Sequence, residues 1–246
     1  MEIISITNQK GGTGKSTSCL ALGAALKKKG YKVLYIDLDA QGNLTYALGA
    51  TNSAGVTAID LLKGKFNLAD VKGDVIISTP ELATADQLLS KTGIEYKLKE
   101  ALQGIKHKYD YILIDTPPSM GILTINALTA SHSVIIPAQA DIFSLQGITQ
   151  IKDTIEAVKE YCNKALTVKG IVLTRFNGRA IISKDLADVL KAEAAKLGTR
   201  LFNTKIRECT ALKEAQANQQ DIFTYAPNSN GASDYMDLTK EVMKAG

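Results

Sequence analysis

A glycine-rich stretch near the start of the chain contains the residue types that phosphate binding requires. Its residues are Lys10, Gly11, Gly12, Thr13, Gly14, Lys15, Ser16 and Thr17. Glycines let backbone N–H groups crowd around phosphate oxygens, and the first turn of a following helix adds a favourable dipole. Lys15 can then reach the β- and γ-phosphates of a nucleotide, and the Ser16 hydroxyl can hold Mg²⁺. The pattern predicts a phosphate-binding loop, and the simpler alternative is a glycine-rich turn with a solvated lysine.

Carboxylates end two apolar stretches further along the chain. Asp37 and Asp39 end the first of them, and Asp115 ends the second. An acid that follows a buried strand can hold Mg²⁺ through a coordinated water, which would complete the metal site begun by Ser16. The alternative for Asp115 is a strand-end acid that caps a turn.

The loop and the acids need elements that bring them together. Short β-branched stretches and helix-forming stretches alternate along the chain. They predict strands at residues 3–6, 31–37, 75–77, 111–115, 133–137 and 170–174, and helices at 19–26, 57–62, 96–105, 145–161 and 183–197, with another helix starting at Thr79. Such alternation indicates an α/β fold, a mostly parallel twisted sheet with helices on both faces. Because ligands bind outside the carboxyl ends of such strands, the loop and the acids are expected on one rim.

The length and composition limit the class of protein. At 246 residues and 26.4 kDa, with 45% hydrophobic and 22% charged residues, the chain fits one α/β domain. No apolar run approaches the ~20 residues that cross a bilayer, and the chain enters a strand at once, without a secretory signal. Its three cysteines lie far apart, which argues against a disulfide framework or a zinc site. We expect a cytoplasmic protein.

The glycine-rich loop departs from the usual G-x-x-x-x-G-K-[ST] pattern. Gln9 stands where the first glycine belongs, and a second lysine, Lys10, opens the loop. This arrangement resembles the deviant Walker A loop of the ParA/MinD family of ATPases, whose first lysine is called the signature lysine.

Other segments extend this resemblance over nearly the whole chain. Residues 37–43 resemble the family's Asp-x-Asp-x-Gln-Gly-Asn switch I segment, with Ala40 where the family often has proline. Residues 115–119 resemble its Walker B and switch II segment, and residues 212–215 and 225–229 resemble late elements of ParA/Soj proteins. The sequence is therefore similar to the short ParA or Soj type, which has no N-terminal helix-turn-helix domain. We expect residues 1–246 to form a single ATPase domain.

The resemblance implies a P-loop NTPase-like fold that binds ATP and Mg²⁺. It implies hydrolysis of ATP to ADP and phosphate, slow until a partner stimulates it, with catalytic roles for Lys10, Lys15 and Asp39. In the family, the acid at position 39 orients and deprotonates the attacking water, and the acid at position 37 lies nearer the metal shell. The implied metal site consists of Ser16, Asp37, Asp39 and Asp115.

The second lysine of the loop has a physical consequence. Like charges ~4 Å apart repel by about 4 kcal/mol at an effective dielectric constant of ~20, so Lys10 and Lys15 need the compensating charge of a triphosphate. In the ParA/MinD family, the signature lysine reaches across a two-fold interface to the partner subunit's nucleotide. The resemblance therefore implies a homodimer that forms with ATP and not with ADP.

The sequence gives a weaker indication of the residues that would contact the adenine base. Asn177 follows the strand predicted at 170–174, and the family uses an asparagine near this position against adenine. Ile206 and Arg207 occupy the loop where the family often has an Ile-Pro pair. The alternative for Asn177 is a plain turn residue.

Basic residues are concentrated in the last third of the chain. Residues 175–213 contain nine Lys and Arg against four acids, a net charge of +5 in a chain whose net charge is +4. Short ParA proteins bind DNA non-specifically as ATP dimers, associate with the nucleoid, and are stimulated by a ParB-like protein that binds the centromere. The candidate DNA contacts are Arg179, Lys184, Lys196, Arg200 and Lys205. The alternative is that these residues form solvated helix faces.

Two other functions use the same loop. A MinD-like positioning ATPase would hold the membrane through a basic amphipathic C-terminal helix, but acids outnumber Lys240 and Lys244 here, so we expect no membrane attachment. A metabolic enzyme of the dethiobiotin-synthetase type would need a polar substrate pocket, and the sequence offers no such set of residues. The resemblance favours an ATPase for DNA partition, whether of a plasmid, a chromosome or a mobile element.

Overall fold

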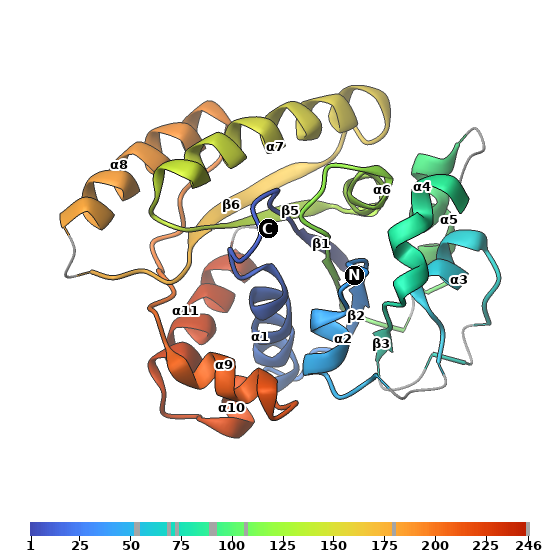
Figure 1. Ribbon diagram of the computed structural model, residues 1–246, viewed down its shortest axis with the longest axis horizontal. Helices are drawn as coiled ribbons and strands as arrows, with labels where there is room; N and C mark the ends of the chain where they lie inside the picture. The colour runs from blue at the N-terminus through green and yellow to red at the C-terminus, as the bar shows by residue number, and fades with distance from the viewer. Residues whose placement is uncertain are drawn as a thin grey trace.

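The strands of the computed structural model form a parallel sheet in the centre of the molecule (Figure 1). The structure describes residues 1–51, 55–67, 70–71, 74–88, 93–105, 108–178 and 181–244. The described strands are β1 (Glu2–Ile6), β2 (Val33–Asp37), β3 (Val75–Ile76), β4 (Tyr111–Asp115), β5 (Ser133–Ala138) and β6 (Thr167–Leu173). Their order is β3-β2-β4-β1-β5-β6, and each neighbouring pair is parallel. The predicted α/β fold with a parallel sheet is confirmed.

The strand register sets where the functional residues meet. Asp115 pairs with Ile6 of β1 on one side and with Asp37 of β2 on the other. The carboxyl ends of these three strands are therefore level, and the loop after β1 lies beside both acids. This is the rim that the alternation of strands and helices predicts.

One face of the sheet is covered by helices from the two ends of the chain. They are α1 (Lys15–Lys28), α2 (Asn43–Ala47), α9 (Thr210–Ala217), α10 (Ile222–Tyr225) and α11 (Asn230–Lys244). Ile4, Ile6, Leu22, Tyr35 and Leu238 are among the buried residues of this core. A Cβ atom on Gly23 of α1 would lie 2.3 Å from the ring of Tyr35, so this close helix–sheet contact requires glycine.

The other face is covered by the helices of the middle of the chain. They are α3 (Ala58–Lys63), η2 (Pro80–Thr84), α4 (Ala85–Leu88), η3 (Ile94–Tyr96), α5 (Lys97–Leu102), α6 (Ile122–Ala130), α7 (Ile142–Tyr161) and α8 (Ile181–Lys196). Two groups of buried residues lie under them, one below α3 to α6 and one below α7 and α8. None of the helices in the described ranges is long and apolar enough to span a membrane.

Helices α2, α9 and α10 were not predicted, and two further differences from the predicted elements have a clear physical reason. The helix predicted to start at Thr79 begins as the 3₁₀ turn η2, with Pro80 at its first position. Helix α6 has no counterpart in the prediction, because seven of its nine residues are buried and it carries no charged side chain. A helix buried on most of its surface shows no amphipathic period that the sequence could reveal.

Candidate active site

The glycine-rich loop leaves β1 and enters α1 in a shape that only glycine adopts easily. Gly12 and Gly14 have φ angles of 75° and 85°, in the left-handed region. Thr174, just after β6, donates a hydrogen bond of 2.8 Å from Oγ1 to the Thr13 carbonyl. Gln139, just after β5, donates one of 2.8 Å from Nε2 to the Gly12 carbonyl. Two neighbouring strand ends therefore hold the loop in place.

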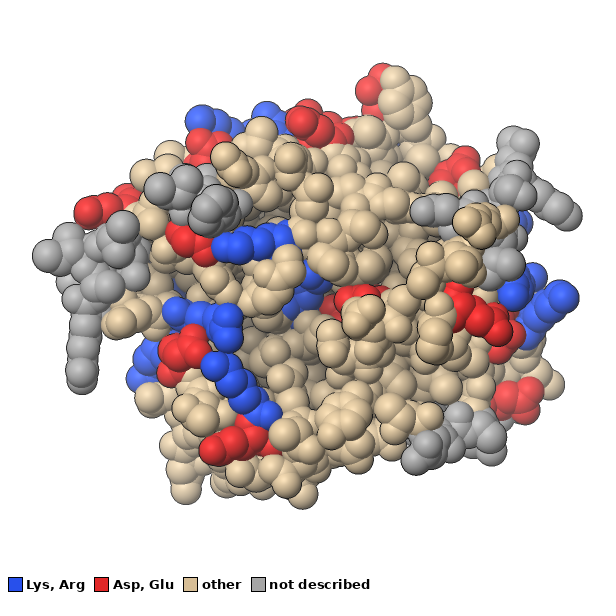
Figure 2. Space-filling view, viewed as in Figure 1, with Lys and Arg blue, Asp and Glu red and all other residues tan. Residues whose placement is uncertain are grey.

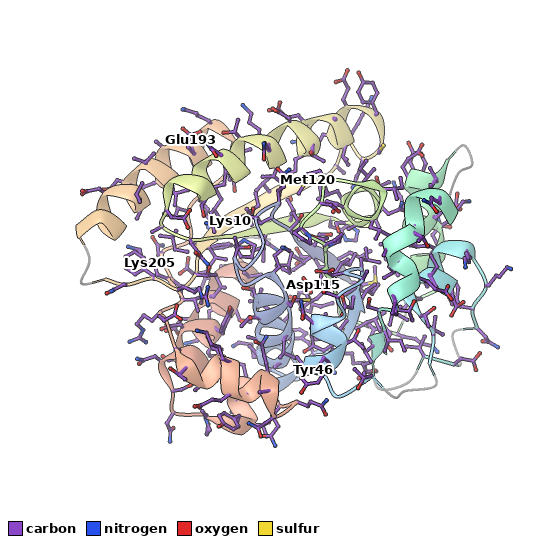
Figure 3. All side chains as sticks on the ribbon, in the orientation of Figure 1. Lys10, Tyr46, Asp115, Met120, Glu193 and Lys205 are labelled. Atoms are coloured by element: carbon purple, nitrogen blue, oxygen red, sulfur yellow. The ribbon has the colours of Figure 1, made fainter. Side chains whose placement is uncertain are left out.

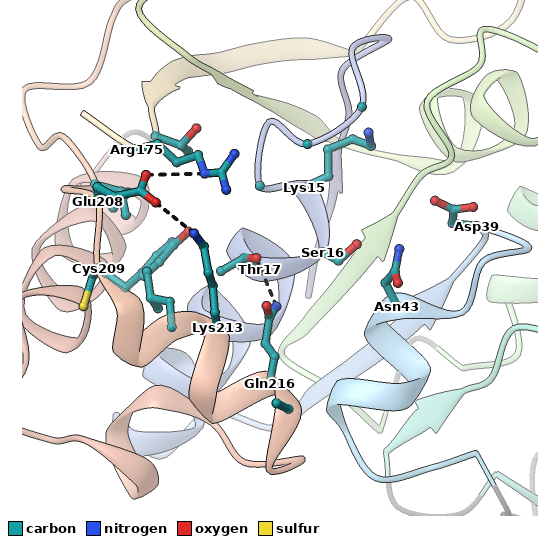
Figure 4. A pocket seen from close by; sticks show the side chains of 18 of the residues that line it. Lys15, Ser16, Thr17, Asp39, Asn43, Arg175, Glu208, Cys209, Lys213 and Gln216 are labelled. Carbon is teal, nitrogen blue, oxygen red and sulfur yellow. Dashed lines mark hydrogen bonds and ion pairs between the residues drawn. The ribbon is translucent and has the colours of Figure 1, made fainter. Parts of the chain in front are cut away.

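A cavity of about 500 Å³ opens beside this loop, within the size range of small-molecule sites. Its walls come from the loop, the segment after β2, the end of β6 and helix α9 (Figure 4). The lining includes Gly11, Gly12, Gly14, Lys15, Ser16, Thr17, Asp39, Ile206 and Arg207. Six of the eight predicted loop residues and Asp39 therefore meet at one cavity, whereas Lys10 and Thr13 are not among its lining residues.

Lys15 is a buried cation at the base of this cavity. Its side chain is 7% exposed, and its Nζ donates to the Lys10 carbonyl at 3.4 Å. Burial lowers the pKa of Lys15, although the charges of Asp115 and Asp39 act in the opposite direction. Among the described contacts, Lys15 makes no ion pair with either carboxylate. A buried ammonium group of this kind fits a site for phosphate oxygens.

Asp115 is a fully buried carboxylate at the end of β4. Neither of its oxygens has a hydrogen-bond partner of normal geometry among the described residues. Burial and the charge of Asp37 raise its pKa well above the usual value, whereas Ser16 and Lys15 act in the opposite direction. A buried carboxylate without a partner, close to a hydroxyl, fits the requirements of Mg²⁺, which takes oxygen ligands and usually keeps several waters.

Asp37 and Asp39 differ in their surroundings although they are two residues apart. Asp37 is fully buried and accepts hydrogen bonds of 2.8 Å from both Thr45 N and Thr45 Oγ1 and of 3.1 Å from Asp39 N. Burial raises the pKa of Asp37 to about 6, and these hydrogen bonds oppose the shift. Asp39 faces the cavity and accepts a hydrogen bond from Gln41 N. Asp37 thus orders the turn that presents Asp39, and its place near the metal stays a prediction.

Removing the buried charge of Asp115 gives a testable change in stability. Because the pKa of Asp115 is raised in the folded state, the folded chain holds a proton that the unfolded chain lacks, and stability falls as pH rises through that interval. We expect Asp115→Asn to stabilise the nucleotide-free protein by about 1–3 kcal/mol at pH 8, and by little in acid. The same variant should weaken the Mg²⁺ dependence of ATP binding.

Thermal unfolding of the nucleotide-free protein between pH 5 and pH 8 measures the first effect. Asp153→Asn, which changes an exposed aspartate of α7, is the control and should leave the pH profile unchanged. A variant at position 115 that is less stable than the wild type at pH 8 would contradict an unpaired buried carboxylate.

Lys10 makes an ion pair that the sequence did not predict. Its Nζ lies 2.6 Å from Oδ2 of Asp141, and Oδ1 of Asp141 accepts a hydrogen bond of 2.8 Å from Ser144 N as the N-cap of α7. Burial pulls the pKa of Asp141 upward, but hydrogen bonds from Lys10 and Ser144 together hold it below the usual value. Lys10 is not among the residues that line the described cavity. In this structure it is therefore held beside α7.

Several contacts of the site were missed from the sequence. Gln139 and Thr174 follow strands β5 and β6, so the rule that ligands bind at carboxyl ends could have found them. Gln216 of α9 donates a hydrogen bond of 3.0 Å to Thr17 Oγ1 (Figure 4). The exposed Tyr46 of α2 also lines the cavity. The rule for strand ends could not have found Gln216, because α9 does not directly follow a strand.

The residues predicted to contact the base lie in different places. Ile206 is buried and lines the cavity, as does Arg207, whose guanidinium makes an ion pair of 2.6 Å with Asp234. Asn177 is exposed and is not among the described lining residues. Near this wall, Glu208 lies between Arg175 and Lys213, at 3.4 Å and 3.0 Å (Figure 4).

The predicted DNA contacts are only partly described. Arg179 lies outside the described residues, and the side chain of Lys184 is not described either. Lys196 pairs with Glu193 at 2.6 Å, and Arg200 donates from Nη2 to the Glu241 carbonyl at 3.3 Å. Lys205 lies over the Phe176 ring, 4.4 Å from its centre. Glu193 and Lys205 are on the α8 side of the molecule (Figure 3), and charges of both signs lie side by side around the hollow in Figure 2.

A parallel sheet that carries a phosphate-type loop between β1 and α1, with strand-end acids beside it, is the architecture of the P-loop nucleoside triphosphatases. Comparisons with known proteins agree. A family model described as an AAA domain matches residues 1–168. The chain is 39% identical to the sporulation initiation inhibitor protein Soj of Bacillus subtilis (strain 168), over 100% of this chain and 99% of that protein.

Two further relatives are chromosome-partitioning proteins. The chain is 37% identical to the chromosome-partitioning ATPase Soj of Treponema pallidum (strain Nichols), over 96% of this chain and 94% of that protein. It is 34% identical to the chromosome partitioning protein ParA of Caulobacter vibrioides (strain NA1000 / CB15N), over 99% and 94%. The chain belongs to the Soj/ParA group of the ParA/MinD family of deviant Walker A ATPases.

Solved structures share the fold. Cobyrinic acid a,c-diamide synthase from Mycobacterium smegmatis, solved with ADP and magnesium, has a TM-score of 0.85 and 29% identity, over 99% of this chain and 94% of that chain. The cell division ATPase MinD of Pyrococcus furiosus has a TM-score of 0.79 and 27% identity, over 100% and 99%. The fold is therefore shared by a synthase and by a cell division ATPase.

Proposed function

We propose that this chain is a DNA-partition ATPase that binds ATP and Mg²⁺ in the cavity beside the glycine-rich loop. The observation that carries the proposal is that Lys15 and Asp39 line that cavity, while the buried Asp115 lies close enough to Lys15 for its charge to act on the ammonium group. Relatives named as partitioning ATPases, and a neighbour of 29% identity solved with an ATP analog and magnesium, support it.

The chemistry follows from what each side chain can do. Lys15 and the backbone N–H groups of the loop bind the β- and γ-phosphates and stabilise the charge that develops during transfer. Ser16 and Asp115 would hold Mg²⁺, which supplies further neutralisation of phosphate charge. Asp39 orients the attacking water and accepts its proton, as in-line hydrolysis requires.

The proposed switch uses a second copy of the chain. Lys10 leaves Asp141 and reaches the nucleotide of the partner subunit, so that ATP and not ADP drives dimerisation. The dimer binds DNA non-specifically through basic side chains and thereby associates with the nucleoid. A ParB-like protein stimulates hydrolysis, which separates the subunits.

The decisive measurement is steady-state phosphate release with random-sequence duplex DNA and the ParB-like partner. We expect low basal turnover that rises severalfold when both are present, and DNA affinity that rises with ATP and falls steeply with salt. Lys15→Gln should abolish the stimulated rate. Hydrolysis that ignores DNA and the partner but demands a metabolite would favour the metabolic alternative, and ATP-dependent binding to vesicles would favour a MinD-like function.

A further inference from the structure

Five lysines lie near the amino ends of the strands β2 and β4, at the opposite end of the sheet from the nucleotide cavity. This lysine cluster consists of Lys27, Lys28, Lys29, Lys32 and Lys108. The first three end α1 or follow it, and the strand residues beyond Lys32 and Lys108 pair in the sheet. Helix α1 has 14 residues, so the cluster lies about 20 Å from the phosphate loop.

The cluster is organised around a concave surface. Lys27, Lys32 and Lys108 line a hollow of about 520 Å³ together with the rings of Tyr31 and Tyr109. The loops that carry these lysines are joined, because Asp110 N donates to the Lys32 carbonyl at 2.8 Å. Lys27, Lys32 and Lys108 therefore converge on one surface, whereas Lys28 lies over the Phe223 ring, 5.7 Å from its centre.

The five lysines of the cluster are bordered by three acids, so part of their charge is not compensated inside the molecule. Among the described residues, only Lys27 of the cluster makes an ion pair, at 3.4 Å to Asp74. The other bordering acids are Asp110, which accepts a hydrogen bond from Lys32 N, and Asp221, which caps α10. Lys29, Lys32 and Lys108 are exposed. Their mutual repulsion would be relieved by an external polyanion.

A simpler explanation accounts for part of the cluster only. The negative end of the helix dipole favours cations in the last turn of α1, which explains Lys27 and Lys28. It does not explain Lys32 and Lys108, which lie on other segments around the hollow. By contrast, basic residues of the 175–213 segment are often paired with acids, as in Arg175, Lys196, Arg207 and Lys213.

We propose that the lysine cluster is a surface that contacts the phosphate backbone of duplex DNA. Lysines give point charges without base readout, which suits a sequence-independent contact. A membrane surface is a poorer fit, because the large side chains that line the hollow, Tyr31 and Tyr109, are only partly exposed. The proposal rests on the proposed DNA function, but it places the contact far from the nucleotide cavity, so a weak contact persists without nucleotide.

The test compares two triple variants that remove the same charge. One is Lys29→Gln with Lys32→Gln and Lys108→Gln, and the control is Lys152→Gln with Lys159→Gln and Lys164→Gln on and after α7. Fluorescence anisotropy with a labelled 30-bp random-sequence duplex is measured with and without ATP, across salt concentrations. The cluster variant should bind at least about tenfold more weakly at 50 mM salt, with a salt slope shallower by about 2 to 3, and its basal ATPase rate should be unchanged.

The outcomes separate the two proposals. Equal duplex affinity of the cluster variant, the control and the wild type would overturn the lysine cluster as a DNA surface, even if ATP still strengthens DNA binding. Absence of any ATP effect in the wild type would instead contradict the proposed switch. Co-sedimentation with phosphatidylglycerol vesicles that only the cluster variant loses, without a loss of duplex binding, would assign the surface to membrane and also overturn the proposal.

Discussion

Asp39→Ala is expected to lower ATP hydrolysis by about 10²- to 10⁴-fold, the range for loss of a positioned general base. Asp39 is 8% exposed and lies on the cavity wall, where it can contact a water in line with a γ-phosphate. The side chains proposed to bind the phosphates and Mg²⁺, Lys15 and Ser16, are left unchanged by this substitution. ATP binding should therefore persist while turnover is almost lost.

Two measurements on the same preparation separate these effects. Phosphate release gives the turnover, and equilibrium binding of a fluorescent ATP analog with Mg²⁺ gives the affinity. Asp153→Ala removes an exposed carboxylate from α7 and should change neither. Undiminished phosphate release by Asp39→Ala would exclude Asp39 as the group that activates water.

The second large effect is expected on assembly. In an Asp39→Ala background, which retains ATP, the protein should sediment as a dimer with ATP and as a monomer with ADP or without nucleotide. Adding Lys10→Ala should remove the ATP-dependent dimer. Each lost charge-assisted hydrogen bond is worth about 1.5–3 kcal/mol, and a symmetric dimer has two, so the dimer should weaken by about 10²- to 10⁴-fold.

Asp141 provides the matched comparison for this experiment. Asp141→Asn keeps an oxygen that can cap α7 but removes the charge that holds Lys10 at 2.6 Å. Dimerisation with ATP should then be as strong as before or stronger, because Lys10 is easier to release. A dimer that forms with ADP would contradict the nucleotide switch. If Lys10→Ala and Asp141→Asn weaken the ATP-dependent dimer equally, the ion pair between Lys10 and Asp141 has only a structural role.

The sequence was sufficient for those parts of the site that depend on chain order. The strands that end at Ile6, Asp37 and Asp115 were predicted closely, because buried parallel strands are short, apolar and β-branched. The rule for carboxyl ends then placed the loop and the acids together without any contact being known.

The remaining contacts depend on tertiary packing that no local pattern reveals. The pair of Lys10 and Asp141 joins residues 131 positions apart, and the hydrogen bond between Gln216 and Thr17 joins residues 199 apart. A count of charges along residues 175–213 also leaves out Asp234 and Glu241, which contact Arg207 and Arg200 from outside that segment.

The missing side chain at Gly23 has a mechanical consequence. Because the Tyr35 ring occupies the space where a Cβ of Gly23 would stand, α1 and β2 are in close contact at this point, and sliding one past the other would disrupt the buried core. Helix α1, whose first turn contains the proposed phosphate-binding residue Lys15, is thus held against the sheet. We therefore expect any rearrangement during nucleotide exchange in the segments that follow β2 and β4. There the backbone no longer pairs with neighbouring strands, because the pairing ends at Asp37 and Asp115.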